Sequence, residues 1–206
     1  MALVKYNNNS LSAVTSTAGM PAGAMTLIKE QTASSSATIS FVHGTSDVVL
    51  DSTYPIYLFK YINVHPATDN AEFTVNFRDG STAYDATKTS TFFNAYQDEA
   101  DGGAGVAYNT ANDLAQATGV QNILGDLGNG NDESGAGYFY LFSPSSTTFV
   151  KHYIGQSHNY NGSNYAQNVF YAGYCNVTAA IDGVQFAMSS GNIDAGTIKL
   201  YGIKDS

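Results

Sequence analysis

The alternation of apolar and polar side chains near the C-terminus constrains the fold more than any other feature of the sequence. Apolar side chains occupy every second position at Val184, Phe186 and Met188. After a polar Ser-Ser-Gly-Asn corner, the alternation resumes with Ile198 and Leu200. A period of two is that of a β-strand with one buried face. We therefore expect the chain to close its own sheet with two half-buried strands, as in a β-sandwich or barrel.

Short apolar segments separated by Ser, Thr, Gly and Asp turns recur along most of the chain. About ten such strands, roughly 8–12 residues apart and without a long amphipathic helix, indicate an all-β fold, an antiparallel jelly-roll-like β-sandwich. The Gly- and Asp-rich region 97–135 is predicted to be loop, with a helical turn or two at 112–118. Besides the two C-terminal strands, the predicted strands span residues 25–30, 37–42, 48–50, 54–63, 72–78, 89–96, 137–143, 147–154 and 168–176.

Residues 1–24 differ in composition from the rest of the chain. They are small and polar, without a sustained period, and can bury little surface by themselves. We therefore divide the chain into an extended anchoring arm, 1–24, and a β-sandwich domain, 25–206. An idle tail is the alternative. The arm interpretation rests on apolar side chains that could anchor the segment on a neighbouring surface: Leu3, Val4, Tyr6, Leu11, Val14 and Met20.

The charge balance argues against two classes of partner. The 206 residues include 17 acidic and 8 basic side chains, which gives a net charge of −9, and Arg78 is the only arginine. Nucleic acids and anionic membrane surfaces both attract clustered Lys and Arg, so we expect neither as a partner. Charged residues make up 12% of the chain, half of the usual share of about 25%. The surface is therefore expected to be polar but uncharged.

Candidate catalytic and transition-metal groups are sparse. Cys175 is the only cysteine, so the chain has no internal disulfide, and its apolar surroundings predict a buried thiol. His152 and His158 are six residues apart, roughly 20 Å along an extended strand, and could share a metal only if the chain turned between them. The acidic residues lie mostly in turns, and no Gly-x-Ser-x-Gly elbow is present. We therefore predict a protein that is not an enzyme and has no metal site.

One loop resembles a calcium-binding sequence. Residues 128–132, Gly-Asn-Gly-Asn-Asp, are similar to one turn of the Gly-Gly-x-Gly-x-Asp repeat. In that repeat, glycines let backbone carbonyls face inward and a carboxylate, here Asp132, supplies charge to a hard cation. Such motifs work in tandem, whereas this chain has one copy without the paired first glycine. We therefore favour a solvated loop and no cofactor, with Asp132 as the candidate calcium ligand.

A Tyr- and Asn-rich segment is the candidate recognition site. It contains Tyr160, Asn161, Asn164 and Tyr165 close together in the sequence. Flat rings give contact area at low entropic cost and amides give hydrogen bonds, which is the composition of adaptable binding loops. Sugars need both kinds of contact, so these four residues are the predicted glycan-binding set. The alternative is that the loop is only a turn between two strands.

Three segments together resemble the structural β-sandwich proteins, of decoration and fibre type, of tailed bacteriophages that infect marine bacteria. They are Met-Thr-Leu-Ile from Met25 with Gln-Thr-Ala-Ser-Ser-Ser-Ala, Ser-Pro-Ser-Ser-Thr-Thr-Phe-Val-Lys-His from Ser143, and Met-Ser-Ser-Gly-Asn-Ile from Met188 with Gly-Thr-Ile-Lys-Leu-Tyr-Gly. The resemblance extends from about residue 25 to the end, and its closing pattern is the most specific part. Because that pattern recurs in modules at different positions on the virion, it supports a virion protein better than one location.

The resemblance implies a non-enzymatic virion structural protein. In the first of two roles, it is a capsid decoration or cement protein docked through its N-terminal arm. In the alternative role, it is a tail-fibre or adhesin module that binds host surface glycans. Either protein would be made in the host cytoplasm, since the N-terminus lacks the apolar core of a signal peptide, and would reach the virion surface. Its partners would be other virion proteins and further copies of itself, with a trimer favoured.

Overall fold

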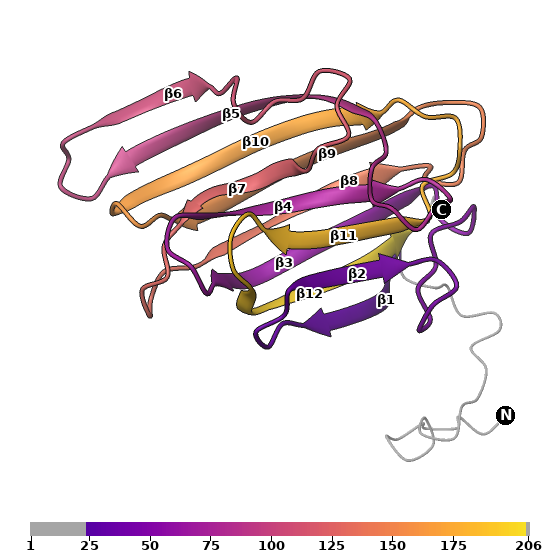
Figure 1. The fold of residues 1–206 in the computed structure, drawn as a ribbon, viewed down its shortest axis with the longest axis horizontal. Coiled ribbons are helices and arrows are strands. Elements are labelled where there is room, and N and C mark those ends of the chain that lie inside the picture. Colours follow the sequence, from indigo (N-terminus) through magenta and orange to yellow (C-terminus); the bar gives the residue numbers. More distant parts are fainter. Residues whose placement is uncertain (1–23, 205–206) are drawn as a thin grey trace, which may run out of the picture.

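The computed structural model describes residues 24–204, which form a β-sandwich of twelve antiparallel strands and contain no helix. This confirms the predicted all-β sandwich. The chain crosses repeatedly between the two sheets, and Figure 1 shows the smaller sheet lying over the larger one. In spatial order, the eight-stranded sheet contains β1 (Met25–Thr32), β12 (Ile193–Ile203), β3 (Ile56–Pro66), β8 (Gly135–Phe142), β9 (Lys151–Tyr160), β10 (Tyr165–Cys175), β5 (Lys88–Asp98) and β6 (Ala104–Tyr108). The four-stranded sheet contains β2 (Thr38–Val42), β11 (Gly183–Met188), β4 (Ala71–Arg78) and β7 (Gln121–Leu127).

Aromatic rings from both sheets fill the space between them. Phe59 on β3 stacks on Phe139 of β8 in the larger sheet, with ring centroids 4.8 Å apart. Phe73 on β4 stacks on Phe186 of β11 in the smaller sheet, at 5.6 Å. Phe59 and Phe186 then meet across the interface at 5.8 Å. All four side chains are fully buried, and such ring pairs contribute about 0.5–1.5 kcal/mol beyond the area that they bury.

The two C-terminal strands have the predicted alternation, but they belong to different sheets. Val184, Phe186 and Met188 point into the core from β11, and Ile198 and Leu200 do so from β12. The polar corner between them carries the chain from the smaller sheet to the larger one. These strands therefore connect the two layers of the sandwich instead of forming one hairpin.

The structure corrects the sequence prediction for residues 97–135, which are not all loop. They include β6, made mostly of small residues, and β7, which Gly125 and Asp126 interrupt, so neither strand shows a clear alternation in the sequence. Residues 112–118 form no helix. Instead, Ala117 exchanges two backbone hydrogen bonds with Lys88 at the start of β5, at 2.8 and 2.9 Å.

A second correction concerns residues 48–50, which were predicted to be a strand. They form no strand, although Val48 and Leu50 are both buried in the core. The apolar pattern therefore identified buried side chains correctly but gave the wrong backbone conformation. The connection between β2 and β3 thus adds two side chains to the core.

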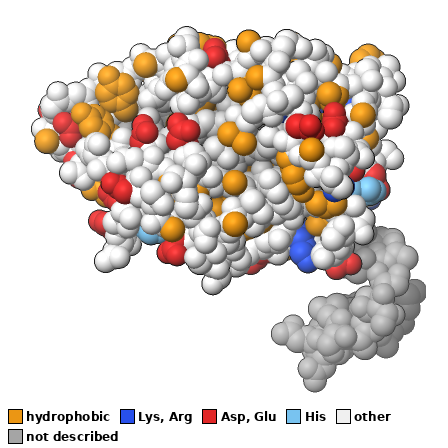
Figure 2. Space-filling view, in the orientation of Figure 1, with side chains coloured by type: hydrophobic (Ala, Val, Ile, Leu, Met, Phe, Trp, Pro, Cys, Tyr) orange, Lys and Arg blue, Asp and Glu red, His pale blue; other side chains and the backbone are white. Residues whose placement is uncertain are grey.

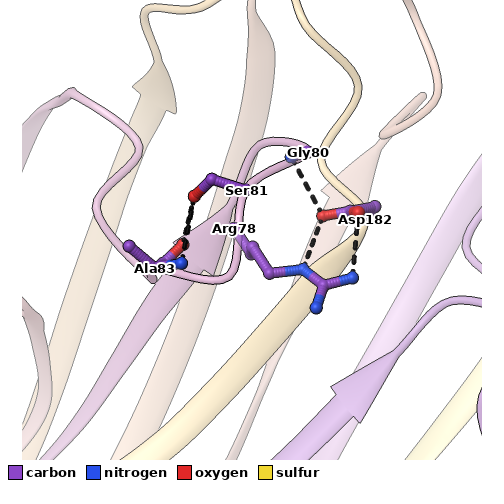
Figure 3. A network of polar contacts seen from close by, with 5 residues as sticks. All are labelled: Arg78, Gly80, Ser81, Ala83 and Asp182. Atoms are coloured by element: carbon purple, nitrogen blue, oxygen red, sulfur yellow. Dashed lines mark hydrogen bonds and ion pairs between the residues drawn. The ribbon is translucent and has the colours of Figure 1, made fainter.

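The single arginine joins two neighbouring strands of the smaller sheet. Arg78 at the end of β4 donates two hydrogen bonds to the carboxylate of Asp182, which precedes β11, from Nε to Oδ1 and from Nη2 to Oδ2, both at 2.9 Å (Figure 3). The Gly80 backbone N–H donates to the same carboxylate at 3.2 Å, and the Asp182 N–H donates to the Arg78 carbonyl at 3.0 Å. Burial raises the pKa of Asp182, but the hydrogen bonds from Arg78 and Gly80 outweigh it and hold that pKa below its ordinary value.

We expect Arg78→Lys to lower the free energy of unfolding by about 1–2 kcal/mol, because a lysine keeps the positive charge but cannot form the bidentate pair of hydrogen bonds with Asp182. Since the pKa of Asp182 is lowered by folding, this stabilisation is present at neutral pH and is lost as the pH falls through the folded-state pKa. Urea unfolding at neutral and acidic pH measures both effects. Lys199→Arg, at the exposed ion pair with Glu30, is the control. Equal unfolding midpoints for Arg78→Lys and the unmodified chain would contradict the prediction.

Candidate interaction surface

The outer face of the eight-stranded sheet is the surface that points away from the smaller sheet. Strand register places its side chains in rows, because directly opposed residues of neighbouring strands point to the same side. One row runs Leu27, Tyr201, Leu58, Tyr140 and Ile154, from β1 across β12, β3 and β8 to β9. Large apolar side chains thus extend across most of the width of the sheet.

Exposed apolar side chains are concentrated on this outer face. Among the described residues, eleven large hydrophobic side chains are exposed, and eight of them belong to outer-face rows. Two of the eight, Phe93 and Tyr138, pack against further outer-face rings: Phe93 stacks on Phe170 at 5.0 Å, and Tyr138 meets Tyr140 edge-on at 5.7 Å. The eight are Met25, Leu27, Ile62, Phe93, Val106, Tyr108, Tyr138 and Ile154.

Two shallow depressions lie side by side on the outer face. The first, of about 320 Å³, lies over β9, β10 and β5, with Ala172 as a small residue between Ile154 and Thr91. The second, of about 300 Å³, lies over β8, β9 and β10, and its walls include Tyr138 and Gln156. In the second depression, the Gln156 amide donates to Asn168 Oδ1 at 3.1 Å and the Tyr138 hydroxyl donates to Gln156 Oε1 at 3.3 Å.

The outer face of the smaller sheet has a different character. Its strands present mainly polar side chains, for example Gln185 of β11, which donates to the Ser40 hydroxyl of β2 at 3.0 Å. Thr74 of β4 donates to the Ala187 carbonyl at 3.0 Å. Figure 2 shows a side of the molecule where hydrophobic and charged side chains are scattered among polar ones. The outer face of the smaller sheet is therefore more polar than that of the larger sheet.

The structure does not bring the four predicted glycan-binding residues onto one face. Tyr160, at the end of β9, belongs to an outer-face row, whereas Tyr165, at the start of β10, points to the inner side and meets Tyr96 there at 5.8 Å. Asn161 Oδ1 accepts hydrogen bonds from the backbone N–H of Ser163 and Tyr165, both at 3.0 Å, so its side chain holds the turn. Asn164 has a φ of 64° and accepts a hydrogen bond from the Tyr160 hydroxyl at 2.9 Å.

The other candidate residues lie apart from one another. Asp132 is exposed in the turn before β8, where the neighbouring Glu133 carboxylate accepts a hydrogen bond from the Gly130 N–H. His152 and His158 are both exposed on the outer face along the continuous strand β9, which does not turn between them. Within residues 24–204, no three His, Cys, Asp or Glu side chains are grouped as metal ligands would be. No helix long and apolar enough to cross a membrane is found in that range.

The predicted anchoring residues lie outside the described part of the chain. These are the six apolar residues between Leu3 and Met20, all within 1–23. The described chain starts at Ala24, next to β1 at one edge of the eight-stranded sheet. The arm therefore stays a prediction from the sequence.

A buried cluster of two lysines and one cysteine was missed by sequence reasoning. Cys175 ends β10, and register places it between Lys88 of β5 and Lys151 of β9, all three fully buried. Lys88 Nζ donates to Asn76 Oδ1 and to the Ala86 carbonyl, both at 2.6 Å, and Lys151 Nζ donates to the Val177 carbonyl at 2.8 Å. Burial lowers the pKa of both lysines, that of Lys88 to about 8.

Burial also sets the pKa of the Cys175 thiol. It raises the pKa of Cys175 to about 12, and the two lysines offset this only in part. The thiol is therefore protonated at neutral pH and closed off from solvent, as the sequence predicted for a buried cysteine. A buried thiol of this kind is unreactive, since the thiolate is the nucleophile.

We expect the Cys175 thiol of the folded protein to be unreactive toward a thiol-specific chromogenic reagent near pH 8 and to react fully after denaturation in guanidinium. Phe149→Cys, which adds a second cysteine at a position that is 74% exposed, is the reference for an accessible thiol. Rapid labelling of the unmodified folded chain would show that the end of β10 opens to solvent, contrary to the structure.

Comparison with known proteins adds no family to these observations. No protein-family model matches the chain, and no curated protein matches its sequence. The arguments about function therefore depend on the sequence resemblance, on the fold and on the outer face of the eight-stranded sheet.

Proposed function

We propose that this chain is a non-enzymatic structural protein of a tailed-phage virion, a capsid decoration protein that docks through its N-terminal arm. The observation that supports a structural role most strongly is that, of the eleven large hydrophobic side chains exposed among residues 24–204, eight lie on one outer face. Proteins that act alone in solution rarely expose wide apolar patches, which mark surfaces that bind other proteins.

The dimensions of this face fit a protein partner. Eight strands with a spacing of about 4.8 Å make a surface roughly 35 Å wide. A standard protein interface buries about 800 Å² on each partner and is rich in aromatic residues. Tyr138, Tyr140 and Phe170 are large rings of that kind, and they lie near the middle of the sheet on β8 and β10. A bound sugar would occupy only one of the two depressions.

The virion assignment rests on the sequence resemblance described above. The chain's composition is compatible with it, because a net charge of −9 and uncharged polar side chains keep a protein soluble at high copy number. Arm docking would add modest affinity for each copy, and many neighbouring copies on a capsid would multiply it through avidity.

A second candidate function is that of a tail-fibre or adhesin module that binds host glycans. The observation that favours it is the depression over β8, β9 and β10, where the Tyr138 ring lies beside the Gln156 and Asn168 amides. A flat ring next to amide groups is the combination that a sugar requires. This depression brings such groups onto one face, which the hairpin residues Tyr160 and Tyr165 do not do.

If the outer face docks on a virion protein, Ile154→Lys should reduce the number of copies incorporated into particles at least tenfold. The lysine would place a charge in the middle of the apolar face, at a cost of several kcal/mol on docking. Quantitative mass spectrometry of particles assembled with the variant measures the copy number. Thr38→Lys, at an exposed position of β2, is the matched control and should leave incorporation unchanged. Normal incorporation of Ile154→Lys would contradict the docking role of this face.

Deletion of residues 1–24 tests the arm separately. We expect the shortened chain to fold, because the described strands form a large buried aromatic and aliphatic core among themselves, and to be lost from purified particles. Circular dichroism with a urea titration verifies folding, and antibody detection on particles measures incorporation. Loss of folding would contradict the two-part organisation of the chain, and unchanged incorporation would contradict anchoring by the arm.

A further inference from the structure

The four sheet edges of the sandwich differ in how they are protected from pairing with another strand. Edge strands present unpaired N–H and C=O groups, and proteins usually block them with charges, bulges or covering groups. The edges are β1 and β6 in the larger sheet and β2 and β7 in the smaller sheet. Three of the four carry a recognisable blocking feature.

On β1, the register with β12 is interrupted between Leu27 and Lys29, and charged side chains follow at Lys29 and Glu30. On β2, the Gln31 side-chain amide covers the edge by donating to the Ser40 carbonyl at 2.8 Å. These features bend, charge or cover the two edges, so that neither offers a flat row of backbone groups to a new strand.

The edge of β7 is covered by the end of β9 and the turn that follows it. The Asn159 amide donates to the Gly125 carbonyl at 2.9 Å, and the Gly162 N–H donates to the Asp126 carbonyl at 3.2 Å. Leu127 also forms an isolated bridge with Asn161. The backbone groups at this edge therefore already have partners within the chain.

β6 has none of these features in the part of the chain that the structure describes. Its sequence, Ala-Gly-Val-Ala-Tyr, contains no charge and no proline, and its register with β5 is continuous from Ala104 to Tyr108. Val106 is 74% exposed and Tyr108 is 53% exposed. Figure 1 shows β6 as the outermost strand of a hairpin that projects beyond the smaller sheet.

The hydrogen bonds at the two ends of the β5–β6 hairpin show which backbone groups of β6 are not bonded to β5. The Asp98 N–H donates to the Gly103 carbonyl, and the Asn109 N–H donates to the Phe92 carbonyl. In an antiparallel pair these bonds recur at every second residue, so Gly105 and Ala107 bond to β5. The N–H and C=O groups of the three alternate residues, Ala104, Val106 and Tyr108, therefore point away from β5 toward the open side.

We propose that β6 pairs with β6 of a second copy of this chain, antiparallel and across a two-fold axis. A row of unpaired backbone groups requires an extended strand as its partner, and an identical strand turned by a two-fold axis meets that requirement. The strand is uncharged, so the pairing places no β6 charges opposite one another despite the chain's net charge of −9. The two eight-stranded sheets would join into one continuous sheet with one continuous apolar outer face.

This pairing does not depend on the virion assignment, because the dimer would form in solution. A five-residue edge buries little area, so the expected dimer is weak and depends on concentration. A two-fold pair also differs from the trimer predicted from the sequence, and the same measurement distinguishes the two. The segment before Met25 is a less suitable occupant of this edge, because the described chain begins beside β1, at the opposite edge of the sheet.

Sedimentation velocity of the full chain across a concentration series tests the proposal. The unmodified chain should shift from monomer to dimer as concentration rises. Val106→Pro removes an N–H from the open edge and should stay monomeric under the same conditions, whereas Val106→Thr keeps the N–H and should dimerise normally. A monomer at every concentration, a trimer, or an unchanged dimer in Val106→Pro would each overturn the proposal. Loss of the dimer on deleting residues 1–23 would also overturn it, since the arm would then be the contact.

Cross-linking gives a second measurement that does not depend on how well a proline variant folds. If the two strands overlap fully, Val106 faces Val106 of the second copy at a Cα separation that a disulfide can span. Val106→Cys should therefore give a covalent dimer under mild oxidation. The other cysteine, Cys175, is buried and should not take part in the cross-link. Phe149→Cys, at a loop position that is also 74% exposed, is the matched control and should cross-link far more slowly. Equal rates for the two variants would count against the pairing.

Discussion

Stacked aromatic rings between the two sheets hold the sandwich in one register, and the surfaces of the molecule depend on that register. Phe59 and Phe139 from the larger sheet meet Phe186 from the smaller one in a fully buried cluster. Because side chains alternate between the two sides of a strand, a slip of one residue would exchange the inner and outer faces. The inward position of Phe139 thus also places Tyr138 and Tyr140 on the outer face. The core and the candidate interaction surface are two consequences of one strand alignment.

The low charge of the chain has different consequences on its different surfaces. On the smaller sheet, uncharged polar side chains such as Gln185 and Ser40 bond to one another and face water. On the larger sheet, the outer face is mostly aromatic and aliphatic, with charges such as the Lys199–Glu30 pair at 2.9 Å. Two of the lysines lie in the interior, where Lys88 and Lys151 donate to carbonyl and amide oxygens beside Cys175. The surface therefore carries even less positive charge than the composition indicates.

The sequence predicted the fold class well because strand alternation is a local property. Val184, Phe186 and Met188 could be assigned to the core from their spacing alone, and the structure confirms them. β6 and β7 were missed because their stability comes from pairing with β5 and β4, which the local pattern does not show.

The candidate surface could not be predicted for a related reason. Ile154 and Tyr138 are unremarkable in the sequence, and only the pairing of β8 with β9 places them on one face. Conversely, Tyr160 and Tyr165 are close in sequence, but the hairpin between β9 and β10 directs them to opposite sides. Proximity along the chain was therefore a poor guide to a shared site, because the side on which a strand residue lies depends on its register.

Hydroxyl-radical footprinting, read by mass spectrometry on the free protein and on intact particles, tests the central claim most directly. That claim is our proposal that the outer face of the eight-stranded sheet binds another protein of a virion. The account predicts that Tyr138, Ile154 and Phe93 are oxidised in the free chain and protected in the particle. Val120, in an exposed loop outside the eight-stranded sheet, should be oxidised equally in both. Equal oxidation of the outer-face residues in the two samples, or absence of the chain from purified particles, would contradict it.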